Sequence, residues 1–468
     1  MKVKIDVRGE IMAKSVSLKK RYDVDMTQGG ILRHLVIFSL PLLAGNIFQQ
    51  LYNMVDAWVV GNFVSDSAFS AVGMVGTVIN VLIGFFMGLS NGAGVLISQY
   101  YGAKQYAKVH DTVHTSNVMT LILGVIFTIL GIAMVPFVLN LIMKMPENVY
   151  PQGKAYLTIY FAGVIGLMIY NMCSSILRSV GDSKRSFYFL VISAVVNTVL
   201  DLVFVLVFKM GVEGVAYATI IAQFISAVLS MMALVKSDTC IVLVFKDLRI
   251  NFDELKKIFS IGFPSAIQLA ITAFSNVFVY SYINYFGSDM AGGWTAYSKI
   301  DQFIMLPLQS ISIAITTFVG QNYGKNDIPR ARKGVRVAFL LAFGISAFLM
   351  IPELVFSPYL VRFFNSKPEV IEYGTLLIRW ITPFFLLNSV TQILSGALRG
   401  TGNTKAPMII MLTSFVGFRQ CYLYIMSNFI SNTEIPIAMA FPAGWMLCAF
   451  LTFMYYMKAG FSKKRNIV

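Results

Sequence analysis

Two aspartates lie inside long apolar stretches of the chain, where a charged side chain is costly. Asp56 is in the stretch 35–60, and Asp201 is in the stretch 187–208. Asn197 precedes Asp201 by four residues, so on a helix its amide and that carboxylate share one face. Carboxylate and amide oxygens suit Na⁺, and two close carboxyl groups can share a proton. These three residues are the predicted cation site, with H⁺ or Na⁺ as the occupant.

Each residue also has a structural interpretation. Asp56 could be an interfacial carboxylate in contact with water, and Asn197 could make an interhelical hydrogen bond. An internal repeat separates the interpretations, because an acidic cluster required by the fold should occur twice. In the second half, Val279 takes the place of Asp56, and residues near Phe418 and Tyr422 take the places of Asn197 and the aspartate after it. The acidic cluster is therefore expected once, in the first half.

The second half has charged residues of its own in apolar stretches. Lys299, Asp301 and Arg379 fall near the outer ends of their stretches, where snorkelling or mutual pairing is expected. Arg419 is deeper. It either lines a cavity, or it is a structural brace that pairs with a carboxylate or with backbone carbonyls.

Pro41 precedes Asp56 within the same stretch. Proline removes a helical hydrogen bond and permits a kink. The kink is either a hinge that links the cation site to a gate or a fixed bend.

The composition is typical of an integral membrane protein. Of the 468 residues, 57% are hydrophobic and 13% are charged, whereas about 25% are charged in a typical soluble domain. Many stretches reach the roughly 20 residues that cross a bilayer as a helix, and none alternates like a barrel strand. The predicted fold is all-α and polytopic. The predicted spans are 35–60, 68–98, 113–139, 153–176, 187–208, 214–236, 258–284, 294–320, 335–360, 373–397, 407–428 and 435–457.

Three sequence matches at one spacing indicate a duplication. Residues 99–102 match 321–324, residues 177–184 match 398–405, and Pro41 matches Pro264. An even number of spans in each half gives two six-helix bundles of the same orientation, related by pseudo-symmetry. Transporters with such parallel repeats typically bind substrate between the halves and alternate access by rocking one half against the other.

The distribution of Lys and Arg predicts the orientation. With the N-terminus inside, most basic residues fall in cytoplasmic loops, so both termini are expected in the cytoplasm of a multi-pass protein of the cell (inner or plasma) membrane. The predicted parts are an N-terminal segment 1–34, an N-lobe 35–236, a cytoplasmic linker 237–257, a C-lobe 258–457 and a cytoplasmic tail 458–468.

Several other functions are not indicated. The net charge of +15 is spread through loops, so no nucleic-acid partner is expected. No cleavable signal peptide is apparent. No P-loop, H-E-x-x-H motif or nucleophile triad is found, so we predict neither an enzyme nor a bound cofactor. The four cysteines are expected to have packing roles and are Cys173, Cys240, Cys421 and Cys448.

The segment Leu51–Trp58 with Gly61, the Asn197 pair and the loop Leu398–Lys405 resemble the multidrug and toxic compound extrusion (MATE) family, in particular its DinF-like branch. The likeness covers about residues 30 to 457. It implies twelve helices in two lobes, antiport of drug-like, often cationic compounds against Na⁺ or H⁺, and a cation site in the N-lobe at the three residues named above. The expected partners are small-molecule substrates and the lipid bilayer, and we expect the protein to act as a monomer.

The sequence departs from the NorM-like branch of that family. That branch has an acidic residue in the tenth span, where this chain has Asn388. The resemblance therefore does not predict a second cation site in the C-lobe, for which Asp301 is the candidate substitute. Two other hypotheses are a flippase for lipids or lipid-linked oligosaccharides, which would need a basic cavity with a residue such as Arg419, and a channel or sensor.

Overall fold

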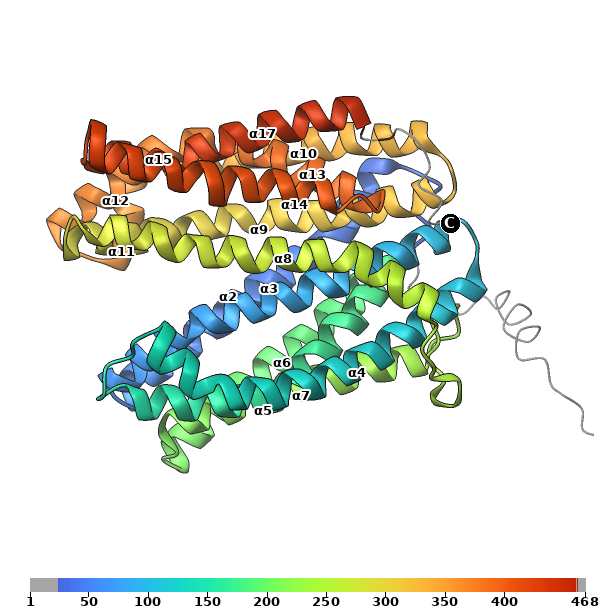
Figure 1. The fold of residues 1–468 in the computed structure, drawn as a ribbon, viewed down its shortest axis with the longest axis horizontal. Helices are drawn as coiled ribbons and strands as arrows, with labels where there is room; N and C mark the ends of the chain where they lie inside the picture. Colours follow the sequence, from blue (N-terminus) through green and yellow to red (C-terminus); the bar gives the residue numbers. More distant parts are fainter. Residues whose placement is uncertain (1–23, 460, 462–468) are drawn as a thin grey trace, which may run out of the picture. The chain divides into compact units, whose positions relative to one another are not determined.

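The computed structural model describes residues 24–459 and 461, and it contains helices and no strand in this part of the chain (Figure 1). Twelve helical segments are long and apolar enough to cross a membrane. Each overlaps one of the twelve predicted spans, which confirms the all-α polytopic fold. The first residues of the predicted N-terminal segment, 1–23, lie outside the described residues, as do residues 460 and 462–468 of the predicted tail.

The spans consist of α-helices, some of which end in or contain a short π-helical or 3₁₀ segment. In the first half these are α2 (Ile31–Phe63), α3 (Asp66–Gly102), α4 (Tyr106–Phe137) with η1 (Val138–Ile142), α5 (Tyr150–Ser179), α6 (Lys184–Leu202) with η2 (Val203–Val207), and α7 (Gly211–Val235). The connection between the two halves contains the 3₁₀ helix η3 (Phe245–Asp247). The second half contains α8 (Phe252–Asn284), α9 (Ser288–Gly324), α10 (Ile328–Val355), α11 (Ser357–Phe364), α12 (Pro368–Ile381), η4 (Thr382–Phe384), α13 (Phe385–Gly400), α14 (Lys405–Met411), η5 (Leu412–Phe418), α15 (Arg419–Ile425), η6 (Met426–Ile430), α16 (Glu434–Ala438) and α17 (Ala440–Ala459).

The chain forms two compact units, and three helices are divided between them. Unit 1 comprises Ala44–Ile79 and Leu89–Ser260 together with residues 24–26. Unit 2 comprises Thr27–Leu43, Asn80–Gly88 and the chain from Ile261 onwards. Helices α2, α3 and α8 therefore each contribute to both units. The lobe boundaries expected from the sequence stay a prediction.

The duplicated loop has the same backbone structure in both halves. Gly181 and Gly402 occupy equivalent positions, and their φ angles are 87° and 82°. A side chain would be strained at such angles, which explains glycine at both sites. The next residues, Asp182 and Asn403, each accept a hydrogen bond from the backbone amide three residues later. The internal repeat is therefore structural as well as sequential.

Two boundaries differ from the prediction because of local chemistry. The predicted span 335–360 ends at Val355 and is followed by the separate helix α11, whose second residue is Pro358. Proline lacks the amide that would continue the preceding helix, and it fits the first turn of a new one. The predicted linker 237–257 is shorter in the structure, because α8 already begins at Phe252.

Helices α3 and α8 approach closely in unit 2. A Cβ atom built at Gly88 would lie 2.3 Å from the backbone nitrogen of Ala266. No side chain fits at that crossing without moving one of the two backbones. Gly73 and Gly76 lie on the same helix but have no atom within 4 Å of the corresponding position.

Candidate cation site

The structure brings the three predicted site residues together within unit 1. Asp56 lies on α2, and Asn197 and Asp201 lie one turn apart on α6. The carboxyl groups of Asp56 and Asp201 are close enough to interact directly. All three side chains are buried, with exposed fractions of 8%, 2% and 0% in chain order. The water-exposed interpretation of Asp56 is therefore excluded by its burial.

Five polar atoms at this site have no hydrogen-bond partner among the described residues. Within the described residues, Asp56 Oδ1, both amide atoms of Asn197 and both carboxyl oxygens of Asp201 have no hydrogen bond. The interhelical hydrogen bond considered for Asn197 is thus not formed. Neither aspartate takes part in an ion pair in the described part of the chain. Buried carboxyl groups without partners are costly, so a bound cation or proton would remove a large penalty.

Close packing of α2 on α6 positions the two carboxyl groups. Gly45 allows this approach, since a Cβ there would lie 3.2 Å from the Leu190 side chain, and the rings of Phe48 and Phe187 are 6.1 Å apart. Ser193, one turn before Asn197, fixes α6 against α7, since its hydroxyl donates to the carbonyl oxygen of Ala222 at 2.7 Å. The α-helix ends directly after the Asn197 pair, and the π-helical segment η2 follows. Such segments often occur beside functional sites.

Tyrosines complete the surroundings of the site. Tyr52 and Tyr156 lie within electrostatic range of Asp56, and Tyr156 also interacts with Asp201. Tyr160 lies beside both tyrosines, and its hydroxyl lies beside the Gln223 side chain. The sequence analysis missed these residues. Tyr52 is four residues before Asp56 on the same helix, which is the one signal that could have indicated it.

A second acidic pair lies in unit 2, at positions that the repeat does not pair with Asp56 and Asp201. Asp301 on α9 accepts a hydrogen bond of 3.0 Å from the Tyr297 hydroxyl. Glu353 on α10 interacts with Asp301, is 3% exposed, and has no partner for either carboxyl oxygen within the described residues. Thr382 of η4 lies beside Glu353. Sequence reasoning missed Glu353, although it is an acidic residue inside the predicted span 335–360.

The family of the chain follows from a match that reproduces the duplication. The sequence model of the MatE family matches residues 41–203 and, a second time, residues 264–425. The two matches begin at Pro41 and Pro264, the residues paired by the repeat. The chain belongs to the MatE family. This membership confirms the resemblance drawn from the sequence, although no finding distinguishes the DinF-like branch.

Several named MatE relatives are similar over most of the chain. The chain is 28% identical to "Probable multidrug resistance protein YpnP" of Bacillus subtilis, over 92% of this chain and 96% of that protein. It is 27% identical to "Probable multidrug resistance protein NorM" of Thermotoga maritima, over 88% and 89%. "Multidrug export protein MepA" of Staphylococcus haemolyticus is 20% identical over 82% and 85%.

Solved structures share the MatE fold. One is a MOP superfamily transporter from Pyrococcus furiosus, described as having a binding pocket of reverse polarity that suggests a different function. It has a TM-score of 0.89 and 22% identity, and the match covers 94% of this chain and 98% of that one. An outward-facing multidrug resistance MATE family transporter gives a TM-score of 0.88 at 23% identity, over 95% and 100%. These similarities support the fold of the MatE chain.

The remaining predicted residues of this MatE protein lie apart from the N-lobe site. Arg419 is buried, donates to Ser275 Oγ at 3.1 Å and to Asn276 Oδ1 at 2.8 Å, and lies over the ring of Phe441. It is therefore a brace that holds α15 against α8, and the side chains that accept its hydrogen bonds are neutral. Asn388 is buried on α13, with its amide 3.1 Å from Met305 Sδ.

Lys299 and Arg379 are exposed on α9 and α12, which agrees with snorkelling. The alternative of mutual pairing is not seen for these two residues among the described ion pairs. Pro41 lies inside α2, which continues through it as a helix. The helix passes from unit 2 to unit 1 two residues later, between Leu43 and Ala44. The hinge role of Pro41 stays a prediction.

Proposed function

We propose that the protein is a cation-coupled antiporter that exports small, often cationic, drug-like organic compounds across the cell membrane. The observation that carries the proposal is the group of unpartnered, buried oxygens at Asp56, Asn197 and Asp201. The names of the MatE relatives, which describe multidrug resistance and export, support the substrate class. The protein is not proposed to be an enzyme.

Both H⁺ and Na⁺ fit the chemistry of the site. Na⁺ would take oxygens from the two carboxylates and from the Asn197 amide, which are ligands preferred by hard cations. A proton would be shared between the two carboxyl groups, since two buried carboxylates cannot both stay ionised without cost. In either case, occupancy neutralises charge on α2 and α6. The bound H⁺ or Na⁺ shifts unit 1 from one conformation to another only if it binds the two conformations with different free energies.

Coupling follows if the exported compound and the cation favour different states. A transported organic cation would be attracted to the ionised carboxylates, and the arrival of H⁺ or Na⁺ would remove that attraction. Inward movement of the cation down its gradient would then drive release of the compound outside. Both Asp56 and Asp201 are needed for this exchange.

A flippase for lipids or lipid-linked oligosaccharides is the alternative. It requires a basic surface that recognises phosphate, and Arg419 was the candidate from the sequence. Arg419 is 3% exposed and is occupied by Ser275, Asn276 and two aromatic rings. This packing favours the antiporter over the flippase.

Reconstitution tests the proposal directly. Purified protein in proteoliposomes is given a Na⁺ gradient in one experiment and a pH gradient in another. We expect one of the two gradients to drive transport of a fluorescent organic cation, and that gradient identifies the coupling ion. Asp56→Asn should reduce the gradient-driven rate to the background of empty liposomes, because the coupling charge is gone.

A matched control is Asp238→Asn, which removes an exposed carboxylate in the connection after α7 of the same unit. It should transport like the unaltered protein. Gradient-driven transport that persists in a correctly inserted Asp56→Asn variant would refute the proposed coupling site.

A further inference from the structure

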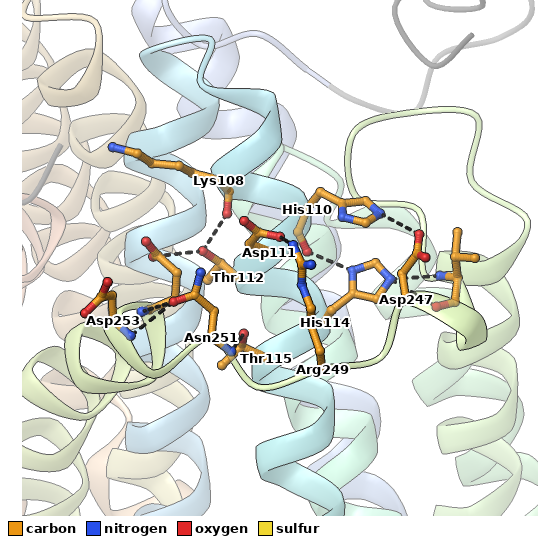
Figure 2. A network of polar contacts seen from close by, with 12 residues as sticks. Lys108, His110, Asp111, Thr112, His114, Thr115, Asp247, Arg249, Asn251 and Asp253 are labelled. Atoms are coloured by element: carbon orange, nitrogen blue, oxygen red, sulfur yellow. Dashed lines mark hydrogen bonds and ion pairs between the residues drawn. The ribbon is translucent and has the colours of Figure 1, made fainter. Parts of the chain in front are cut away.

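The connection between the two halves is bound along the first turns of α4 by polar contacts, all within unit 1 (Figure 2). The backbone amide of Val244 donates to His114 Nε2 at 3.0 Å. Arg249 pairs with Asp111 at 2.9 Å, and the amide of Asn251 donates to Thr115 at 3.1 Å. Segment 244–251, which we call the docked linker, is therefore held at several successive positions of one helix.

Two of the three histidines in the chain lie within this contact region. His110 and His114 are one helical turn apart, and their ring centroids are 4.0 Å apart. Asp247 of the docked linker approaches them, with its Oδ2 3.8 Å from His110 Nε2. One ligand atom from each of the three residues lies within 4.8 Å of the others. Figure 2 shows the imidazoles on the side of α4 that faces Asp247.

The contacts of His114 favour the tautomer in which Nε2 carries the lone pair. Its Nδ1 lies 2.8 Å from the carbonyl oxygen of His110 and can donate to it. In that tautomer Nε2 accepts from the Val244 amide at 3.0 Å, while the Val244 carbonyl oxygen lies 3.2 Å away. Histidines that bind metals usually have this arrangement, in which one nitrogen donates to a backbone carbonyl and the other faces the metal. His114 is 1% exposed, so its ring is oriented before any ion arrives.

We propose that His110, His114 and Asp247 bind a first-row transition-metal dication such as Zn²⁺, with water at the fourth position. Two imidazoles and one carboxylate are ligands for Zn²⁺ and Co²⁺, whereas Mg²⁺ and Ca²⁺ prefer oxygen alone. Metal–ligand bonds of about 2.0–2.1 Å require ligand atoms about 3.3 Å apart in a tetrahedron. The measured spacings would therefore contract modestly.

The exposed partner makes this contraction feasible. The side chain of Asp247 is 47% exposed and lies on a short 3₁₀ turn, so it can move towards the buried imidazole. The metal would take the His114 lone pair that now accepts from Val244. Binding would thus exchange one linker contact for a stronger link through Asp247, and would fasten the docked linker to α4. None of the three residues belongs to the proposed cation-coupling site.

Cobalt titration tests the site. Full-length protein without a histidine tag, with its four cysteines replaced by serine, is stripped with a chelator and titrated with Co²⁺ in detergent. We expect one equivalent to bind, with visible absorption bands of tetrahedral Co²⁺ that Zn²⁺ displaces. His110→Gln and Asp247→Asn should each weaken binding at least tenfold, and affinity should fall as the pH is lowered, because the imidazoles must be neutral.

The third histidine provides a matched control. His34 lies on α2 in unit 2, so His34→Gln should bind Co²⁺ like the parent. Transport by His110→Gln and Asp247→Asn in proteoliposomes verifies that these variants fold. The inference is overturned if the parent binds no Co²⁺, if His110→Gln binds it equally well, or if His34→Gln loses it.

Discussion

Buried carboxyl groups dominate the chemistry at the scale of single residues. Asp56 and Asp201 were recognisable in the sequence because hydrocarbon penalises a charge at their depth. Glu353 has the same property and lies inside the predicted span 335–360, so the same argument could have found it, although the sequence analysis did not name it. Its neighbours Asp301 and Thr382 come from other elements, and no spacing along the chain could have paired them.

Replacement of Glu353 should stabilise the protein. Glu353→Met keeps a similar volume and removes a buried carboxyl group that has no hydrogen-bond partner within the described residues. We expect a higher melting temperature and a gain of about 1–3 kcal/mol in the free energy of unfolding. Thermal unfolding in detergent measures it, with Glu369→Gln, an exposed acid on α12, as the control. A melting temperature of Glu353→Met below that of the parent, measured without added cations, would contradict the expectation.

At the scale of elements, the length of the apolar stretches alone predicted all twelve spans. In a bilayer the backbone polar groups of such a stretch must be bonded internally, which a helix does. The duplicated loops were also predictable, since Gly181 and Gly402 are needed for the same backbone angle. The docked linker was not. His110 precedes the predicted span 113–139 and His114 is its second residue, where polar side chains are ordinary, and the contacts with Val244 and Asp247 depend on tertiary structure.

The α3–α8 crossing gives a paired prediction for one helix. Gly88→Ala should lower the free energy of unfolding by about 1–3 kcal/mol, because the new methyl group would overlap the backbone of Ala266. Gly76→Ala should raise it by about 0.5–1 kcal/mol, since the site is open and alanine favours helix. Melting curves of both variants against the parent check the signs. Equal changes in the free energy of unfolding for the two variants would show that α3 and α8 are not tightly packed at Gly88.

At the scale of the whole molecule, the distribution of basic residues predicts which loops face the cytoplasm. The connection between α4 and α5 contains the exposed Glu147, and the connection between α7 and α8 contains the exposed Asp238. The two loops are separated by three spans, so they must open on opposite sides of the membrane.

Thiol labelling in intact cells tests this orientation. In a cysteine-free parent, Glu147→Cys should react with a membrane-impermeant maleimide added outside. Asp238→Cys should react only after the membrane is permeabilised, because its loop is predicted to be cytoplasmic. The reverse pattern would place both termini outside and invert the direction of transport in the proposal.

The division of α2, α3 and α8 between the two units limits how the chain could be taken apart. A polypeptide cut between residues 236 and 252 would leave the first piece without Phe252–Ser260, which completes unit 1, and the second piece without Thr27–Leu43 and Asn80–Gly88, which complete unit 2. Each fragment would lack segments of its own unit and would need the other fragment to supply them. The two halves of this chain are therefore not expected to fold as two independent proteins.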